Sequence, residues 1–306
     1  HLLAYHSLDV AAVGWVYLER HPTFLNDLAR VFGLAPEILH RWLVFFLAIH
    51  DLGKFSEGFQ NLRRDLFEGL HDRPSQKPYP IRHDSLGFLY WNEALAPLIL
   101  ERENWFGLDL DRRSLRRWCP AFGAWANAMT GHHGRPPETR PNNRQPLLGD
   151  HFSDTDQQAA EAFAREARRL FLEQGAVPER LDVRTFARLS ARLSWWLAGI
   201  AVLADWLGSG NPPFAYQEQP EDLKHYWRAK ALLRAGEAVD RAEVLPAPLA
   251  SSMTFNGLFP DIAQPSDLQA TVASLTLDQG PQLVLMEEVT GAGKTEAALH
   301  LAHRLL

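Results

Sequence analysis

The stretch Phe46–Phe55, FLAIHDLGKF, follows an apolar segment directly with a histidine, an aspartate, a glycine and a lysine. The residues at 38–49, ILHRWLVFFLAI, are apolar almost all round and predict a buried helix. Two interpretations of His50 and Asp51 at its end compete. In the first, they form a polar C-terminal turn, with His50 bonding the last carbonyls and Gly53 closing the helix. In the second, they are a pair of metal ligands.

A histidine–aspartate pair alone does not decide, because the chain contains three: His50-Asp51, His71-Asp72 and His83-Asp84. The composition sets wider limits. The chain has 306 residues, of which 46% are hydrophobic and ten are tryptophan, so one large or two ordinary domains with a substantial core are expected. The net charge of −6 argues against broad coating by nucleic acid.

The single cysteine, Cys119, excludes a disulfide framework and a zinc site built from several thiolates, and it suits a reducing cytosol. The longest apolar run, at 195–204, is about half a bilayer span. The N-terminus has no signal-peptide pattern, and its initial histidine suggests a trimmed chain. We therefore expect a cytoplasmic protein.

The first two-thirds of the chain predict helices separated by proline-rich loops, with no strand-like alternation before about residue 245. Helical patterns cover 38–49, 83–100, 121–129, 156–172 and 184–207. This part therefore predicts a mainly all-α fold.

The pattern changes after LPAPLA at 245–250. A short apolar run, QLVLM at 282–286, has strand character, and it leads through EEVTGAGKT into a helical pattern at 295–306. A strand, a glycine loop and a helix form the context of a phosphate-binding loop. We expect a domain boundary near residue 245.

Several histidines and an aspartate lie at the ends of predicted helices: His6, His50, His83, His132, His133 and Asp205. Asp205 follows ten apolar residues, so it is either a buried charge that needs a partner or metal, or the point where a helix reaches solvent. Imidazoles with two carboxylates form the mixed shell that manganese, iron, cobalt and nickel favour. Two ions could share Asp51 and hydrolyse a phosphate ester. Lys54 either meets phosphate oxygens or is a surface lysine.

The order H…HD…H…HH…D resembles the HD phosphohydrolase superfamily. HDLGK at 50–54, TGHHG at 130–134 and ADWLGS at 204–209, followed by TGAGKTEAAL at 290–299, resemble the type I CRISPR-associated nuclease–helicase family. The resemblance covers the whole chain, and HSLDVAAVGW at 6–15 is similar to the type I-E branch. It implies an HD-domain helical bundle over 1–245, then a linker and the N-terminal stub of a superfamily-two, RecA-like α/β helicase domain over 246–306.

The resemblance also implies a prokaryotic, metal-dependent endonuclease or exonuclease that degrades single-stranded DNA in CRISPR interference. Cascade would recruit it to the displaced strand of an R-loop. Asp51 and Lys54 would be catalytic, and two divalent ions of iron, manganese, cobalt or nickel would be bound. One ion would take His6, His50, Asp51 and Asp205, and the other would take Asp51, His83, His132 and His133.

The helicase portion matches its family at Gly291, Gly293, Lys294 and Thr295, whereas Glu288 stands where the strict loop requires glycine. Gln269 lies where such helicases carry an adenine-reading glutamine. No acidic magnesium motif and no sensing arginines follow. ATP and magnesium are therefore expected to act only in a full-length protein.

Two other functions stay open at this point. One is an HD-family nucleotide phosphohydrolase for small substrates, although a helicase motif is useful only on polymers. The other is a metal-free binding module that presents a surface to Cascade or to an anti-CRISPR inhibitor protein. The complete set of seven ligands speaks against this last function.

Overall fold

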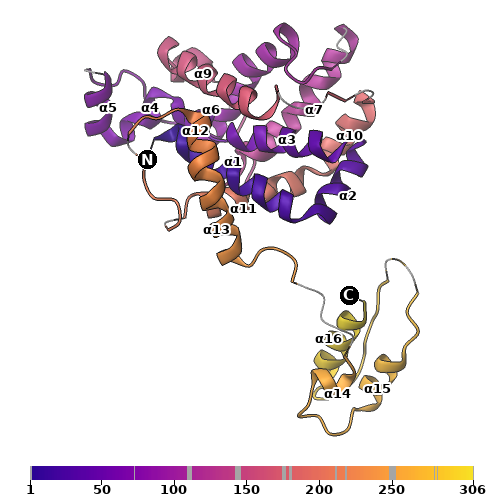
Figure 1. Cartoon of the computed structure of the whole chain (residues 1–306). Helices are drawn as coiled ribbons and strands as arrows, with labels where there is room; N and C mark the ends of the chain where they lie inside the picture. The colour runs from indigo at the N-terminus through magenta and orange to yellow at the C-terminus, as the bar shows by residue number, and fades with distance from the viewer. Residues whose placement is uncertain are drawn as a thin grey trace. The chain divides into compact units, whose positions relative to one another are not determined.

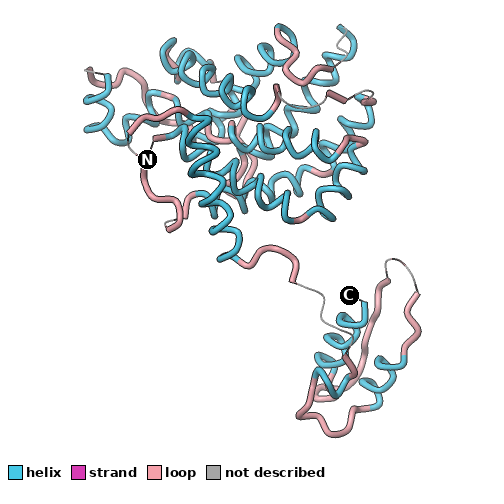
Figure 2. The backbone as a smooth tube through the Cα atoms, in the orientation of Figure 1, coloured by secondary structure: helices cyan, strands magenta, loops and turns pink. Residues whose placement is uncertain are grey.

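The structure, a computed structural model, describes residues 2–71, 73–108, 112–141, 146–173, 177–178, 181–210, 212–217, 219–247, 253–278, 280 and 282–305. Its contacts divide the chain into two compact units, His1–Leu245 and Pro246–Leu306. Among the described residues all regular elements are helices and none is a strand (Figures 1 and 2). The mainly helical fold is therefore confirmed.

Unit 1 contains thirteen labelled α-helices, two 3-10 turns and three π-helical segments among its described residues. The α-helices are α1 (Leu3–Arg20), α2 (Pro22–Phe32), α3 (Pro36–Ala48), α4 (Glu57–Gln60), α5 (Arg64–His71), α6 (His83–Tyr90), α7 (Arg112–Thr130), α8 (Leu148–His151), α9 (Asp154–Phe171), α10 (Val183–Arg192), α11 (Ser194–Gly208), α12 (Leu223–Tyr226) and α13 (Leu232–Ala242). The other segments are η1 (Leu52–Phe55), η2 (Asn61–Arg63), η3 (Trp91–Leu95), η4 (Pro97–Arg102) and η6 (Trp227–Ala231).

Helices α1 and α3 form the centre of this unit. Helix α1 packs against α3, α11 and α13, and α3 also packs against α2, α7 and α9 (Figure 1). The side chains from Leu43 to Ala48 are fully buried, as expected for a helix without a polar face. No single described helix is long and apolar enough to cross a membrane, although the bent pair Pro22–Phe32 and Pro36–Phe55 passes the same length and composition test.

An aromatic cluster fixes α7 and α10 against α3. The rings of Phe46 and Trp125 lie 5.5 Å apart, and those of Phe122 and Phe186 lie 5.4 Å apart. All four side chains are fully buried, and burial of such a ring stabilises the fold by about 1.5–3 kcal/mol. The cluster therefore determines where the C-terminal end of α7 lies.

Two glycines permit close backbone contacts at the ends of helices. A Cβ atom on Gly53 would collide with the carbonyl oxygen of His83, at the start of α6. A Cβ atom on Gly208 would lie 2.9 Å from the backbone nitrogen of Val10, in α1. Only glycine allows this approach, so Gly53 holds the turn after α3 against α6, and Gly208 holds the end of α11 against α1.

The predicted continuous helix at 184–207 is wrong in one respect, since the chain breaks at Leu193 into α10 and α11. Leu193 has φ −98° and ψ 10°, outside the helical pattern. Helix α10 packs against α7 and α2, whereas α11 packs chiefly against α1 and α7. The change of partner explains a break that periodicity does not reveal.

Unit 2 contains α14 (Phe255–Leu258), α15 (Asp267–Ser274) and α16 (Lys294–Leu305). The predicted strand at 282–286 is absent, because these residues form an irregular extended segment (Figure 2). Leu283 and Leu285 are 99% and 83% exposed. A strand needs a backbone partner, and no described residue pairs with this segment.

Candidate metal centre

Helices from distant parts of unit 1 bring the seven predicted ligands to one place. Each ligand lies on or directly beside a helix: His6 in α1, His50 and Asp51 in the turn after α3, His83 at the first position of α6, His132 and His133 in the turn after α7, and Asp205 near the end of α11.

The first cluster, called here the four-residue group, consists of His6, His50, Asp51 and Asp205. One ligand atom from each lies within 4.8 Å of the others. Asp51 Oδ2 is 3.0 Å from His6 Nε2 and 3.2 Å from His50 Nε2. Asp205 Oδ1 is 3.6 Å and 3.7 Å from the same two nitrogens. Two imidazoles and two carboxylates therefore face one small volume.

The second cluster, the three-histidine group, consists of His83, His132 and His133, whose ligand atoms also lie within 4.8 Å of one another. Asp51 Oδ1 is 3.6 Å from His83 Nε2 and 3.7 Å from His132 Nε2. Asp51 thus turns one carboxylate oxygen toward each group. The clusters are divided as the family resemblance implies.

Hydrogen bonds to main-chain carbonyls orient two of the imidazoles. His50 Nδ1 lies 2.7 Å from the Leu47 carbonyl oxygen, and His132 Nδ1 lies 3.2 Å from the Met129 carbonyl oxygen. Donation from Nδ1 leaves each Nε2 free to act as a ligand, as in many metal sites. The interpretation of His50 as part of a polar turn therefore explains its Nδ1 hydrogen bond to a late carbonyl. It does not explain why Nε2 faces the two carboxylates.

Two supporting side chains were not predicted from the sequence. The Tyr79 hydroxyl accepts a hydrogen bond of 2.8 Å from the His83 backbone N–H and lies 3.3 Å from His83 Nδ1. The Ser209 hydroxyl donates to Asp205 Oδ1 at 3.2 Å. The only signal for them is their spacing of four residues from a ligand, which many polar residues share by chance.

Among the described residues, three buried ligand atoms find no hydrogen-bond partner: His50 Nε2, Asp51 Oδ1 and His132 Nε2. A buried polar atom without a partner costs about 1–3 kcal/mol. These atoms belong to both ligand groups, and cations bound in the two groups would satisfy them. Nitrogen and carboxylate donors without a thiolate suit manganese, iron, cobalt or nickel.

The charge state differs between the two groups. Burial disfavours the His50 imidazolium, but the carboxylates of Asp51 and Asp205 outweigh it and raise the pKa of His50 to about 9. Burial lowers the pKa of His83 to about 4 and of His132 to about 3. At pH 7 the four-residue group therefore attracts a proton where a cation would bind, whereas His83 and His132 are neutral and ready to act as ligands.

Lys54 belongs to the centre and is not an ordinary surface lysine. Its Nζ is 2.5 Å from Asp51 Oδ2, and its side chain is 19% exposed. It also lies 5.9 Å from the centroid of the Phe59 ring. The ammonium group therefore adds a fixed positive charge at the edge of the carboxylate, beside the accessible His6 and His83.

The predicted phosphate-loop residues come together in unit 2. Gly291 and Gly293 have φ of 88° and 77°, values that favour glycine. Lys294 begins α16, and its Nζ donates to the carbonyl oxygens of Glu288 and Val289. The buried Gln269 donates to the Gly293 carbonyl at 3.2 Å. Thr295 is exposed at the next position of α16.

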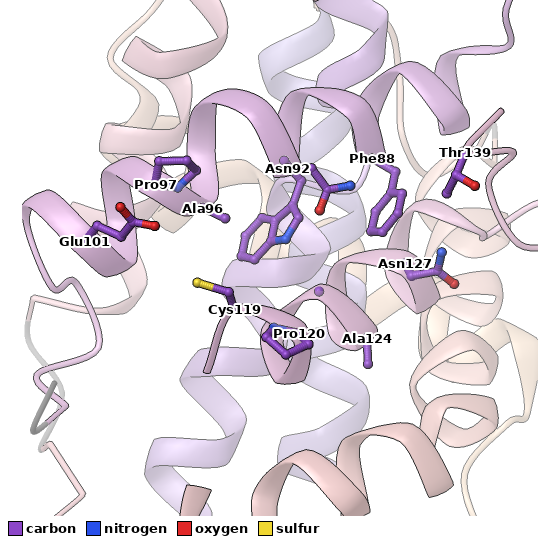
Figure 3. A pocket seen from close by; sticks show the side chains of 12 residues that line it. Phe88, Asn92, Ala96, Pro97, Glu101, Cys119, Pro120, Ala124, Asn127 and Thr139 are labelled. Atoms are coloured by element: carbon purple, nitrogen blue, oxygen red, sulfur yellow. The ribbon is translucent and has the colours of Figure 1, made fainter. Parts of the chain in front are cut away.

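A large cavity of about 610 Å³ lies away from the ligands, between η3–η4 and α7. Phe88, Asn92, Cys119 and Asn127 line it, together with other mainly small or apolar side chains (Figure 3). Its lining contains no histidine or aspartate. The cavity is therefore separate from the candidate metal centre.

The fold and site define a helical domain with a histidine–aspartate cluster that could hold metal ions. The family model described as "Cas3, HD domain" matches residues 1–214. The chain belongs to the Cas3 HD-domain family.

Two curated relatives are CRISPR-associated endonuclease/helicase Cas3 proteins. That of Escherichia coli K12 is 27% identical over 326 residues, and that of Thermus thermophilus is 30% identical over 315 residues. Both alignments cover 100% of this chain but only 35% and 31% of the relatives. The chain thus spans about a third of their length.

Solved structures agree with this assignment. A crystal structure described as a CRISPR-associated protein matches with a TM-score of 0.70 at 28% identity. The match covers 99% of this chain and 32% of the chain in that structure. T. fusca Cas3 with ADP has a TM-score of 0.65 at 25% identity and covers 100% of this chain and 32% of its own. The T. thermophilus Cas3 HD domain, at 22% identity with a TM-score of 0.52, covers 83% of this chain and 89% of its own and shares the fold.

Proposed function

We propose that unit 1 is a metal-dependent nuclease that hydrolyses phosphodiester bonds in single-stranded DNA. The observation that carries this proposal is the position of Asp51, whose two oxygens face two separate groups of ligands. A carboxylate shared by two ligand groups could hold two ions close together, as two-metal phosphodiesterases do. The endonuclease name of the curated relatives supports the same reaction.

The proposed ligands are His6, His50, Asp51 and Asp205 for one ion and Asp51, His83, His132 and His133 for the other. Iron, manganese, cobalt or nickel would supply an activated water and positive charge for the phosphate oxygens. The T. thermophilus HD domain, which shares the fold, was solved in the presence of Ni²⁺.

The chain's own groups then have distinct tasks. His50 and His132 are held by the Leu47 and Met129 carbonyls, so their ligand nitrogens need no reorientation during the reaction. Lys54 places its ammonium group where it can contact a phosphate oxygen and offset the added negative charge. The exposed His133 leaves one side of the centre open to substrate.

The wider context belongs to the same proposal. The curated relatives are endonuclease/helicases about three times as long as this chain, so we assign 246–306 to a linker and the start of a helicase domain. Gly291, Gly293, Lys294, Thr295 and Gln269 would bind ATP with magnesium only in a full-length protein. Cascade is the proposed partner, because one chain of the same fold comes from a CRISPR RNA-guided surveillance complex. The likeness of residues 6–15 to the type I-E branch supports a type I-E system, and we propose that it acts in the cytoplasm.

Metal add-back on a single preparation tests the nuclease. The chain is stripped with chelator, reloaded with manganese, cobalt or nickel, and assayed for bound ions. The same sample is incubated without ATP with circular single-stranded DNA, with circular duplex DNA and with nucleoside triphosphates. Two ions with cutting of the single-stranded circle are expected. Hydrolysis of nucleotides alone would instead indicate a nucleotide phosphohydrolase, and failure to bind ions would indicate a binding module.

A further inference from the structure

An exposed row of arginines and tryptophans runs along α10 and into α11. Arg184, Arg188 and Arg192 recur every fourth residue of α10, and all three are exposed. Trp195 and Trp196 follow in the first turn of α11 with 84% and 58% of their surface exposed. These five residues are called the Arg–Trp row below.

The arginines lie on one face of α10, because residues four apart are neighbours on a helix. The Cα atoms therefore rise by about 6 Å along the axis from one arginine to the next, so the three side chains can contact different phosphates of one bound strand. Within the described parts of the chain, no ion pair involves any of the three. Their positive charge is thus available to an external anion.

The tryptophans add a surface of a different kind. Trp196 packs one side against Phe24, with ring centroids 5.6 Å apart, and this contact holds its ring in place. Trp195 leaves most of its indole in solvent, which is unusual for so large an apolar side chain. Exposed indoles next to arginines form the combination of stacking and charge that binds single-stranded nucleic acid without reading sequence.

The row also has a defined relation to the metal centre. Helix α11 begins beside Trp195 and carries Asp205 ten residues later, which is about 15 Å along the helix axis. A mononucleotide bound at Asp205 is too short to span this separation, whereas a strand of several nucleotides is long enough to do so.

We propose that the Arg–Trp row is a binding site for single-stranded DNA, in which the arginines contact phosphates and the tryptophans stack on bases. This inference rests on the proposed nuclease function, because it makes the row an accessory site for the same substrate. It holds a longer strand next to the centre and raises the effective concentration of the next scissile bond.

The test is binding of a fluorescent oligothymidine of about twenty nucleotides to the whole 306-residue chain in chelator, where no cleavage occurs. Trp195→Ala should weaken binding roughly tenfold, as expected for one lost stacking contact. Arg188→Ala should reduce the slope of log affinity against log salt by roughly 0.7. Leu233→Ala, at an apolar residue of α13 that is 66% exposed, and Arg30→Ala, on α2, should leave both quantities unchanged.

Different outcomes separate the two proposals. Unchanged affinity and salt slope in the row variants, which must retain wild-type circular dichroism, would overturn the inference and leave the metal centre unaffected. Equal losses in the two control variants would also overturn it. A row that instead binds another protein would show wild-type DNA affinity in all variants. Conversely, metal-dependent cleavage that survives Asp51→Ala would contradict the nuclease assignment without touching the binding result.

Discussion

The two ligand groups around Asp51 differ in charge and in exposure. The four-residue group contains two carboxylates, and its side chains are between 0% and 16% exposed. The three-histidine group has no carboxylate apart from the shared Asp51, and His133 lies at the surface. Anionic ligands hold a divalent cation more firmly than neutral ones, and an exposed ligand such as His133 is further weakened by competition with water. We therefore expect one tightly bound ion and one ion that exchanges readily.

The largest effect is expected from Asp51→Ala, which removes the only residue that serves both groups. Both ions should be lost, and DNA cleavage should fall by at least about 1,000-fold because metal catalysis supplies several kcal/mol. Ion counting and initial cleavage rates measure this, with Asp27→Ala on the surface as control. If Asp51→Ala retained both ions, the carboxylate would not bridge the two groups.

Asp205→Asn should separate the groups, because it removes an anionic ligand from one of them only. We expect the ion in the four-residue group to be lost or weakened by at least about 100-fold, since losing a ligand costs more than the roughly 10- to 100-fold typical of supporting residues. The three-histidine group should bind its ion at least as tightly as before, because it no longer shares the Asp51 charge. A cobalt titration followed by visible absorption shows the binding of an ion to each group as a separate step. Equal weakening of both steps would show that the groups act as a single site.

Tyr79→Phe should weaken metal binding in the three-histidine group, by a smaller factor than Asp205→Asn weakens it in the four-residue group. The variant removes the hydroxyl that accepts from the His83 backbone and lies beside Nδ1, so His83 loses its orientation. The second cobalt step should weaken roughly tenfold, and the first should not change. Tyr17→Phe is the matched control, because the Tyr17 hydroxyl lies 3.4 Å from Nδ1 of His21, a histidine outside both ligand groups. An unchanged second step would mean that packing alone positions His83.

The smallest expected difference between the two ligand groups lies in how strongly protons compete with the metal ion. The pKa of metal-free His50 is raised to about 9, so below that pH a cation must displace a proton from the four-residue group. Its affinity should therefore rise with pH, by up to about tenfold between pH 7 and pH 8. The pKa values of His83 and His132, about 4 and 3, add no such dependence in this range. Calorimetric titration in buffers of different ionisation enthalpy counts the released protons.

The sequence correctly predicted those helices whose apolar residues recur with a helical period. The helix at 38–49 and the helices around Asp156–Leu172 follow from apolar periodicity, which the folded chain preserves in α3 and α9. The ligand positions followed from motifs in a fixed order rather than from periodicity. Their convergence could be expected only because a known family shows the same order.

The remaining features depend on contacts between distant segments. The break at Leu193 reflects the different partners of α10 and α11, and the missing strand at 282–286 reflects the absence of a paired segment among the described residues. The role of Tyr79 depends on how the loop before α6 folds back on His83. No local pattern in the sequence encodes these three results.

The proposed bridging role of Asp51 has a thermodynamic consequence of its own, because one carboxylate charge would be divided between two cation positions. The first ion to arrive neutralises the anion that the second one needs, so the two loading steps are linked by negative cooperativity. Such a coupling is reciprocal. Removing the ion from the three-histidine group must tighten the ion in the four-residue group by the same factor that the tight ion imposes on its neighbour. The stoichiometry of the isolated chain will therefore vary with the free concentration of metal.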